Sequence, residues 1–539
     1  MKDILKHLQI PHNGDLPPNQ WVNNDIKPVE SSRRTWTFWT YHNFSVLLGL
    51  NISNYMTGSS LIAMGLTWRQ ALAAIITGNV ISVAVLLANS LPGAFYHIGF
   101  PLANRYVWGL YGSLFVLWNR ILLSIVWYSF QAWIGGECVY VCLQAIWPSI
   151  ETRIPNNMPP STGMSTAQFV SYIIFMFISL PVIYIRPHKL QAFFYISASI
   201  IALFIIAILA WALSTMGDTG FESTISSVDS GDSGWKIAFA IVSTIGGMAA
   251  GILNNDDYSR FGRKPHDVIW GQLIGIPVYG ILCAAVGIVV TAATQNRYGE
   301  ALWNLPNLLS AVMKHGGSGS RAAAFFGGVA LTISQVGLNV PANALAGGFD
   351  LAATFPKYIN LRRGAYITVA MSVACNPWKL VNTATTFLTV LSSYSVFLAP
   401  MIGSMISAYV LVMRQKIKVE DLFPNHHTES IYWYTYGVNW RAPVAWVCGI
   451  VPSLPGFVVT IDPSITVPVA LTRMYYICFL TGAAISAIVF TVLHCIFPAS
   501  GVQSFVKTAP ASEVLMREYR QQWDNSHSVE ALVEEPDKA

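Results

Sequence analysis

Long apolar runs separated by short polar connections dominate the pattern of the chain. A helix that crosses the hydrocarbon core of a membrane needs about 20 mostly apolar residues, and about twelve stretches meet that requirement. The predicted spans are residues 36–62, 70–93, 107–140, 167–186, 190–214, 236–258, 267–293, 322–347, 365–379, 383–413, 442–461 and 474–497. The segment Asn376-Pro377-Trp378-Lys379 interrupts a long apolar region and leaves the division between two of these spans ambiguous. The pattern predicts an all-α polytopic membrane protein.

The composition supports the membrane class. Of the 539 residues, 53% are hydrophobic and 11% are charged, whereas soluble domains carry roughly 25% charged residues. The formal net charge of +5 does not indicate nucleic-acid binding, because the basic residues concentrate in short connections where they set membrane topology. The seven cysteines lie singly in apolar stretches, so neither a disulfide framework nor a metal site is expected.

The distribution of charge between the connections predicts the orientation. Alternate connections, at about residues 105, 186–189, 260–264, 357–363 and 414–418, are basic, and the opposite set includes the acidic stretch 218–232. The positive-inside rule therefore places both termini in the cytoplasm. The expected organisation is a cytoplasmic tail (1–35), a core of ten spans (36–413), a cytoplasmic loop (414–441), two additional spans (442–497) and a second cytoplasmic tail (498–539).

Two predicted spans contain a glycine-bearing interruption near their middle. These are the segment Gly49-Leu50-Asn51-Ile52-Ser53-Asn54 in the first span and Gly246-Gly247-Met248-Ala249-Ala250-Gly251 in the sixth. Broken helices at matching places in two inverted halves are typical of transporters whose site lies near the middle of the membrane. The alternative is that each segment holds packing glycines or a kink.

Four segments make the chain similar to a known family. They are WYSFQAWIGG at residues 127–136, NNDDYSRF at 254–261, QVGLNVPAN at 335–343 and YGVNWRA at 436–442. The chain resembles the nucleobase:cation symporter family, and within it the fungal uracil, allantoin and uridine permeases, from about residue 33 to about residue 498. The resemblance implies two inverted repeats of five helices plus two further helices, and import of a nucleobase or related compound with a proton or sodium ion.

Trp127 and Gln131 are the first candidates for substrate binding. They are four residues apart and therefore share one face of a helix. An aromatic ring for stacking and an amide that both donates and accepts hydrogen bonds suit a planar heterocycle. A packing tryptophan and an interhelical hydrogen bond are the alternative, but the resemblance assigns substrate binding to this pair.

The resemblance adds further amides to the substrate site. It implies a substrate-binding amide in the Gln-x-Gly-x-Asn stretch, where we prefer Asn339 to Asn343, and at the first interruption we prefer Asn54. Many relatives have an aromatic residue in the sixth span that covers the second face of the substrate ring. This chain has Met248 near that place, so the identity of the second stacking residue is left open.

A cation site is expected next to the substrate. The resemblance implies that Ser334 supplies a hydroxyl ligand, and the first interruption, with Asn51 and Ser53, offers side chains or freed backbone carbonyls. Serine hydroxyls in membrane helices also bond to their own backbone, which is the alternative for Ser334. We expect a proton as the coupling ion rather than sodium, on the resemblance to fungal permeases alone.

Ionisable residues in or near apolar spans are expensive and therefore functional candidates. We predict an inner gate or coupling group formed by Arg120, Asp256, Asp257 and Arg260; the alternative is that these charges end helices at the headgroups. Glu137 is a fifth ionisable residue. Helix geometry places it roughly opposite Gln131, so it is not expected beside the substrate.

The sequence predicts a transporter and not an enzyme, because no GxGxxG, Walker or HExxH motif and no arguable catalytic triad is present. We expect a proton-coupled importer of a uracil-, allantoin- or uric acid-type heterocycle in the plasma membrane, without a cofactor or a metal. A thiamine, nucleoside or nicotinamide riboside carrier is the alternative within the family, and a receptor or a membrane enzyme the alternative outside it. By resemblance, a ubiquitin ligase is a possible partner of the tails, through Lys2, Lys6, Lys507 and Lys538.

Overall fold

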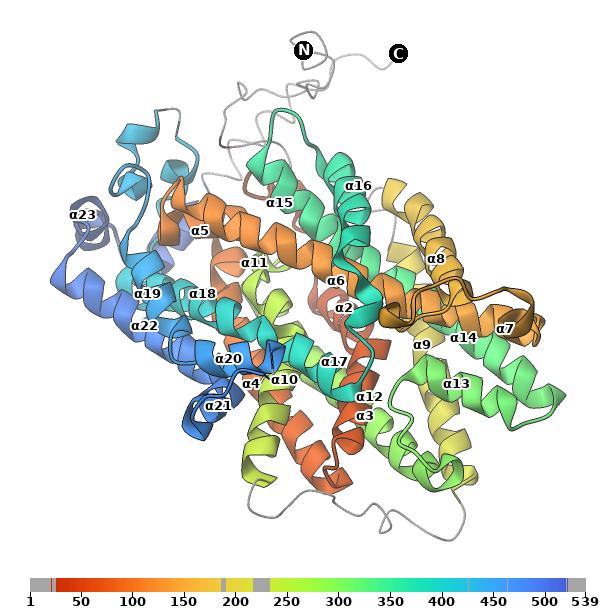
Figure 1. Ribbon diagram of the computed structural model, residues 1–539. Coiled ribbons are helices and arrows are strands. Elements are labelled where there is room, and N and C mark those ends of the chain that lie inside the picture. Colours follow the sequence, from red (N-terminus) through yellow and green to blue (C-terminus); the bar gives the residue numbers. More distant parts are fainter. Residues whose placement is uncertain are drawn as a thin grey trace, which may run out of the picture.

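The computed structural model describes residues 21, 26–185, 191–216, 233–424, 426–462, 464–519 and 521. Within these residues the regular structure is helical, apart from two isolated β-bridges, and the long helices lie side by side in one bundle (Figure 1). Several expected features, among them the acidic stretch 218–232 and the basic pair Arg186 and Lys189, lie outside the described residues. The predicted all-α class is confirmed.

Nine helices are long and apolar enough to cross a membrane, and a bent pair raises the number to ten within the described part of the chain. The nine are α4 (Trp68–Tyr96), α6 (Gly112–Ile146), α8 (Thr166–Tyr184), α9 (Gln191–Ser214), α10 (Ser233–Leu253), α12 (Pro265–Tyr298), α14 (Ser318–Asn339) continued by α15 (Ala346–Thr354), α17 (Ala384–Ser393) continued by α18 (Ser395–Ser407), and α22 (Cys478–Ile496). The bent pair, α19 (Arg441–Ile450) and α20 (Leu454–Ile461), meets at 57°.

The expected count of twelve is not reached because two predicted spans are built from short helices. The first consists of α2 (Phe38–Gly49) and α3 (Ile52–Ala63), each of 12 residues. The ninth is α16 (Leu361–Ser372), also of 12 residues. After α16 the chain turns at Asn376, which has a φ of 49°, so the predicted interruption at Asn376–Lys379 is confirmed.

The predicted break in the first span is also confirmed. Helix α2 ends at Gly49, and Asn51 has an extended backbone with φ −148° and ψ 164° before α3 begins. The Asn51 side chain then caps α3, because its Oδ1 accepts a hydrogen bond from the Asn54 amide at 2.9 Å. An N-cap of this kind satisfies one of the amides that a helix start leaves free.

The predicted break at Gly246–Gly251 is wrong in position. Helix α10 runs without interruption from Ser233 to Leu253. A Cβ atom on Gly246 would lie 2.3 Å from the carbonyl oxygen of Leu391 in α17. Gly246 therefore allows two helices to pack closely, which was the alternative interpretation of this segment.

The sixth span is instead interrupted at its end, at Asn254 and Asn255, before the one-turn helix α11 (Asp256–Ser259). The terminal carbonyl groups of α10 are satisfied from α4, where Asn89 Nδ2 donates to Ile252 O at 2.8 Å and to Leu253 O at 3.0 Å. A buried helix end needs such a partner. The break thus lies several residues after the glycine segment.

The eighth span contains a distortion that we did not predict. Between α14 and α15 the residues Val340–Leu345 form a turn of π-helix directly after Asn339. Pro341 has no N–H group and cannot form the normal helical hydrogen bond, which accounts for the wider turn. Single π-helical turns of this kind are frequent at functional sites.

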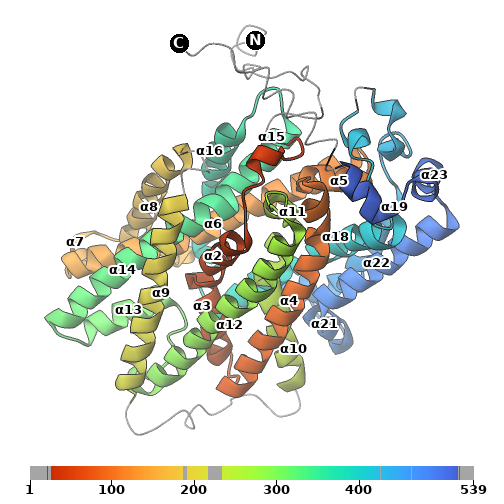
Figure 2. The same cartoon turned by 180° about the vertical axis from the view of Figure 1, so that it is seen from behind.

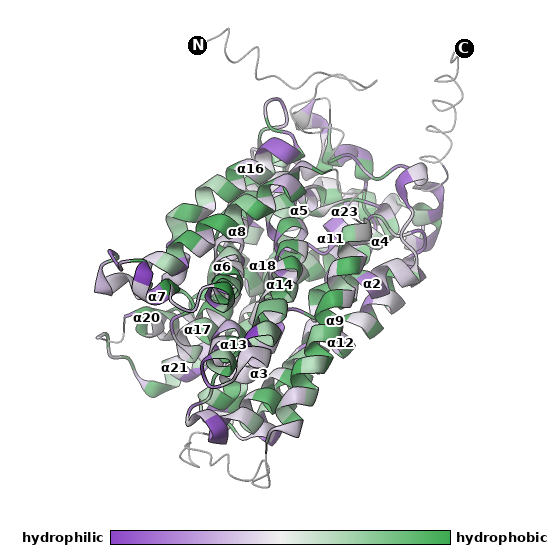
Figure 3. Cartoon of the chain, turned by 90° about the vertical axis from the view of Figure 1, so that its right-hand side faces the viewer, coloured by the Kyte–Doolittle hydropathy of each residue, from purple (hydrophilic) through white to green (hydrophobic). Residues whose placement is uncertain are grey.

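The bundle has two distinct ends. We call the α5 end the one that carries α5 (Phe100–Trp108), α11 and residues 414–440, and the α13 end the opposite one, with α7 (Ile150–Arg153) and α13 (Leu305–Lys314) (Figures 1 and 2). Apolar residues predominate along the middle of the helices, while hydrophilic residues gather toward both ends (Figure 3). This distribution is expected of a protein whose middle part lies in the hydrocarbon core of a membrane.

The segment 414–440 packs on the α5 end. Tyr96 donates to the Gln415 carbonyl at 2.7 Å, and Arg105 Nη1 donates to the Leu422 carbonyl at 2.7 Å. Every residue of α5 is buried beneath this layer. The segment is therefore an ordered cover that joins the last two spans to the connection between α4 and α6.

The close contact at Gly246 gives a test of the corrected sixth span. We expect Gly246→Ala to lower the free energy of unfolding by about 1–3 kcal/mol, because the added methyl group would force α10 away from α17. Gly251→Ala is the matched control, since a Cβ there meets no atom within 4 Å. Thermal unfolding of the two purified variants measures the difference, and equal stability would contradict the packing role.

Candidate functional site

Buried polar side chains from three spans meet in the middle of the bundle. Ser53 Oγ of α3 donates to Gln131 Oε1 of α6 at 3.1 Å. Gln335 Nε2 of α14 donates to the same oxygen at 2.6 Å and to the Gln131 carbonyl at 3.0 Å. The Gln335 Oε1 atom is buried and accepts no hydrogen bond from the described residues. This Ser53–Gln131–Gln335 network leaves one unfilled acceptor at its centre.

A second pair of amides consists of Asn339, one turn further along α14, and Asn343 in the π-turn that follows. Asn339 is fully buried, and its Nδ2 donates to the Tyr128 carbonyl of α6 at 3.1 Å. Its Oδ1 accepts from Asn343 Nδ2 at 2.9 Å. The structure therefore brings Gln131, Asn339 and Asn343 onto the same α6–α14 contact. Their predicted role in substrate binding stays a prediction.

Trp127 belongs to a chain of aromatic rings. Its ring is 9% exposed and lies edge-on to Phe130, with 5.4 Å between centroids. Phe130 stacks on Phe387 of α17 at 5.7 Å, and Phe387 lies 5.5 Å from Trp303. Sequence reasoning missed Phe387, because nothing in its local pattern separates it from lipid-facing aromatics, and Trp303, because it lies in a connection between two predicted spans. Met248, by contrast, offers no ring.

The side chains at the first break mainly form hydrogen bonds with the backbone groups that the break leaves without a helical partner. Asn54 Nδ2 donates to the carbonyls of Leu48 and Gly49 at 3.1 and 2.9 Å, and Asn51 Nδ2 donates to Leu48 at 2.6 Å. The Asn51 carbonyl accepts a bond from the Cys283 thiol at 3.3 Å. These contacts occupy the groups that we expected to be free for a substrate or a cation.

Among the predicted cation ligands, Ser334 most clearly has a side-chain oxygen that is available to a ligand. Its side chain is 1% exposed, and its Oγ has no hydrogen-bond partner in the described part of the chain. Buried polar groups are normally paired, so an unpaired hydroxyl fits a site that binds something else. No group of three or more metal-ligating His, Cys, Asp or Glu side chains exists among the described residues.

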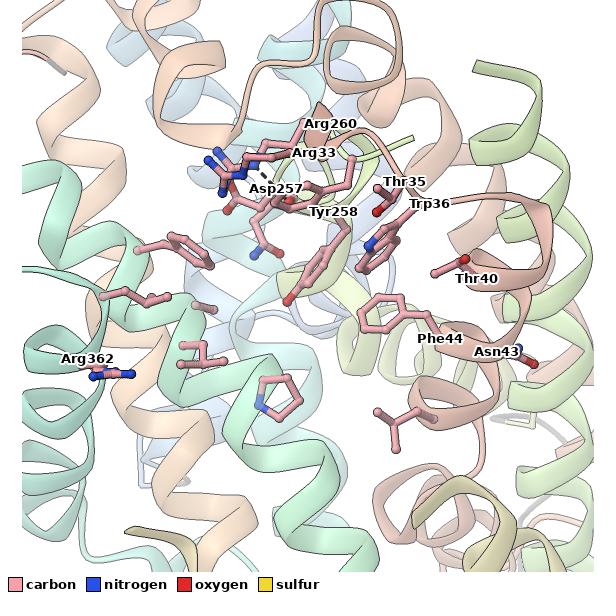
Figure 4. A pocket seen from close by; sticks show the side chains of 18 of the residues that line it. Arg33, Thr35, Trp36, Thr40, Asn43, Phe44, Asp257, Tyr258, Arg260 and Arg362 are labelled. Carbon is pink, nitrogen blue, oxygen red and sulfur yellow. Dashed lines mark hydrogen bonds between the residues drawn. The ribbon is translucent and has the colours of Figure 1, made fainter. Parts of the chain in front are cut away.

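A cavity of about 840 Å³ lies at the α5 end (Figure 4). Basic residues are prominent in its wall, and Arg33 and Arg260 lie close to Asp257 at one edge. The cavity reaches Leu47 of α2 and Pro341, two residues beyond Asn339. Trp127, Gln131 and Asn339 do not line the cavity. The cavity therefore approaches the amide cluster, which we define as Gln131, Gln335, Asn339 and Asn343, from the α5 end without including it.

The acidic gate candidates bind the end of α4 and the start of α5. Asp256 Oδ1 accepts from the Gly93 amide at 2.8 Å, and Asp257 Oδ1 accepts from the Phe100 amide at 3.0 Å. The Arg260 guanidinium lies over the rings of Phe261 and Phe349, at 5.0 and 5.4 Å. These contacts give the charges a structural part in joining α11 to its neighbours, in addition to the predicted gate.

Asp350 is a buried carboxylate that sequence reasoning missed. It lies in α15 with 1% of its surface exposed, and neither of its oxygens has a hydrogen-bond partner in the described structure. Arg120, whose Nη1 donates to Ser124 Oγ at 2.7 Å, acts electrostatically on both Asp350 and Asp257. The predicted eighth span stopped at residue 347, so Asp350 fell just outside it.

A bundle with a broken first helix, a buried amide cluster at mid-depth and a cavity at one end is the architecture of a membrane transporter and not of an enzyme. The chain belongs to the permease family for cytosine/purines, uracil, thiamine and allantoin, whose model matches residues 28–482. The predicted family is thereby confirmed.

Known proteins of this kind are similar over nearly the whole chain. Transporter aclS of Aspergillus oryzae is 34% identical, covering 92% of this chain and 91% of its own length. The allantoin permease of Saccharomyces cerevisiae is 33% identical, with 91% and 78% covered. The structure titled inward facing conformation of Mhp1 has a TM-score of 0.68 at 20% identity, covering 92% of this chain and 97% of that one. At that identity the likeness establishes the fold.

The charges around Arg120 allow a test by paired substitution. We expect Arg120→Gln to reduce the free energy of unfolding by about 1–3 kcal/mol, because it removes the cation that acts on the buried Asp350, while Asp257 keeps Arg260. Asp350→Asn in the same molecule should recover part of that loss. Thermal unfolding of the single and double variants measures the coupling, and Arg321→Gln, an exposed arginine on α14, is the control. Strictly additive effects would contradict an interaction between Arg120 and Asp350.

Proposed function

We propose that the protein imports a nucleobase or a related heterocycle, of the uracil, allantoin or uric acid type, across the plasma membrane by alternating access and together with a proton. The observation that carries the proposal is the buried Ser53–Gln131–Gln335 network, in which Gln131 lies on the same helix as Trp127. The network and Trp127 together supply amide hydrogen bonds and an aromatic ring at the depth where inverted-repeat transporters bind their substrates.

The unfilled acceptor of this network suits the edge of such a substrate. Gln335 Oε1 has no donor among the described residues, and a buried unpaired acceptor costs about 1–3 kcal/mol. A ring N–H group would satisfy it, while a ring carbonyl would accept from an amide that now donates within the protein. Binding would therefore exchange hydrogen bonds rather than leave polar groups unpaired.

The absence of charge in the network favours a neutral substrate. Its members are two amides and a hydroxyl, and no carboxylate takes part in the hydrogen bonds described for it. Thiamine carries a positive charge, which such a site does not balance. Trp127 alone does not discriminate, because an aromatic face also attracts cations; thiamine, a nucleoside and nicotinamide riboside therefore remain the alternative substrates.

The α5 end is the cytoplasmic end in this proposal. Arg33, Arg260 and Arg362 line its cavity, and basic residues concentrate on the cytoplasmic side of membrane proteins. The cavity is then the route by which substrate leaves toward the cytoplasm. Both termini would be cytoplasmic, and Lys507, exposed on α23 (Ser500–Thr508), would be reachable by a ubiquitin ligase; Lys2, Lys6 and Lys538 lie outside the described residues.

The substrate site is tested by removing its two main contacts. We expect Trp127→Ala and Gln131→Ala to weaken uptake roughly 5- to 150-fold, because a lost ring stack or buried amide pair costs about 1–3 kcal/mol. Trp118→Ala is the matched control, since Trp118 is an exposed tryptophan on the same helix. Initial uptake rates, corrected for the amount of protein at the cell surface, measure the effect. Near-normal kinetics in both site variants would reject the assignment.

The substrate and the coupling ion are tested together in a host that lacks its own permeases. Labelled uracil, allantoin, uric acid, cytosine, uridine, thiamine and nicotinamide riboside form the panel. We expect uptake of a neutral heterocycle to rise as the external pH falls from about 7.5 to about 5, to collapse with a protonophore and to ignore replacement of sodium by choline. Sodium dependence that survives the protonophore would instead make Ser334 a sodium ligand.

A further inference from the structure

The connection between α12 and α13, residues 299–304, is clamped onto the α13 end of the bundle. Ser59 Oγ of α3 donates to the Trp303 carbonyl at 2.6 Å. Asn304 Nδ2 donates to Glu137 Oε2 of α6 at 3.0 Å. The Trp303 ring also contacts Phe387 of α17. Three spans that surround the amide cluster thus hold this connection at the end opposite the cavity.

The Glu137–Asn304 contact is chemically incomplete. Asn304 is 2% exposed, and its Oδ1 is buried without a hydrogen-bond partner in the described structure, although its Nδ2 is used. A carboxylate has no hydrogen to offer that oxygen, whereas a carboxylic acid has one. A protonated Glu137 can pair with the amide edge of Asn304 through two hydrogen bonds, accepting one from Nδ2 and donating one to Oδ1.

No cation in the described part of the chain forms an ion pair with Glu137. The titratable groups on the elements around this part of α6 are Cys138 and Tyr140 of α6, Tyr172 of α8, Glu300 of the connection itself, Lys314 of α13 and Arg321 of α14. None of them forms a hydrogen bond or an ion pair with Glu137 in the described part of the chain. Lys314 instead lies 3.5 Å from Glu151, which also accepts from Tyr140 and Gln144.

We infer that Glu137 binds an external proton as the 299–304 connection closes over the substrate, and that the acid–amide pair with Asn304 holds the closed state. The inference rests on the proposed function, in which the α13 end faces outward. Glu137 is half-buried in this closed arrangement, and the hydrogen bonds from Asn304 and Trp133 replace only part of the water that the carboxylate loses. Closure therefore favours the neutral acid, and the proton moves from external water to the carboxylate.

The sign of the pH effect follows from this preference. The closed state binds the proton more tightly than the open state, in which Glu137 meets water. Low external pH therefore favours closure and high external pH favours the open connection. An inward proton gradient would then promote closure of the 299–304 connection over the bound substrate. The closing step would thus respond to the same gradient that drives transport.

The test is Glu137→Gln, which keeps the shape of the protonated acid. The amide supplies the missing hydrogen-bond donor but neither binds nor releases a proton. We expect this variant to lose the dependence of uptake on external pH between about 7.5 and 5, with uptake at the higher pH no longer reduced. Glu151→Gln, which neutralises an exposed carboxylate at the same end, should keep the parent profile. Glu137→Ala removes the clamp and should lower uptake at every pH.

A second measurement does not depend on transport. Ala301→Cys places a thiol in the connection, and its labelling by a membrane-impermeant thiol reagent, relative to the chain without it, reports opening. Because the thiolate is the reactive form, protonation of the cysteine also slows labelling at low pH, and an exposed model thiol measures that contribution. Labelling should fall as the pH falls in the parent and become independent of pH with Glu137→Gln. A pH response of both uptake and labelling that survives Glu137→Gln would overturn the inference, whereas parent uptake that ignores pH and protonophore would reject proton coupling itself.

Discussion

The need to satisfy every backbone and side-chain polar group without water governs this structure. In the hydrocarbon region an unpaired polar group costs several kcal/mol, so a broken helix survives when other groups complete it. The first break does so with its own residues, since Asn51 and Asn54 bind the carbonyls that α2 leaves free. The sixth span uses Asn89 of α4 for the same purpose. The helix ends are thereby fixed to particular neighbours.

The same constraint makes the exceptions informative. The buried polar atoms without a hydrogen-bond partner among the described residues include Ser334 Oγ, Gln335 Oε1, Asn304 Oδ1 and both oxygens of Asp350. They are spread along the depth of the bundle, from the α13 end through the amide cluster to the α5 end. As a transporter alternates between its outward-open and inward-open forms, side chains at each of these depths exchange hydrogen-bond partners. An atom that is unpaired in one form is available for a hydrogen bond in the other.

The sequence predicted the fold better than it predicted the breaks and the charges. Runs of apolar residues locate spans because lipid imposes a length on them, and the Asn-rich segment after Gly49 revealed the first break. Glycine alone is ambiguous, since Gly246 serves close packing against Leu391. Asp350 was missed because the predicted eighth span ended at residue 347, and hydropathy does not show that α15 continues to Thr354 inside the protein. Hydrogen-bond pairs such as Gln131 with Gln335 join positions 204 residues apart, which no local pattern reveals.

The π-turn at Val340–Leu345 has a consequence for how α15 can change. A wider turn accommodates one residue more than an α-helical turn, and each residue of an α-helix corresponds to about 100° of rotation. The face that α15 presents is therefore set by the backbone around Pro341 and not by α15 itself. If the extra residue were removed and the turn tightened, Asp350 would rotate away from Arg120 while the α14 amides kept their places. A change of one residue in backbone register would thus separate Asp350 from Arg120 and leave Gln335 and Asn339 in place.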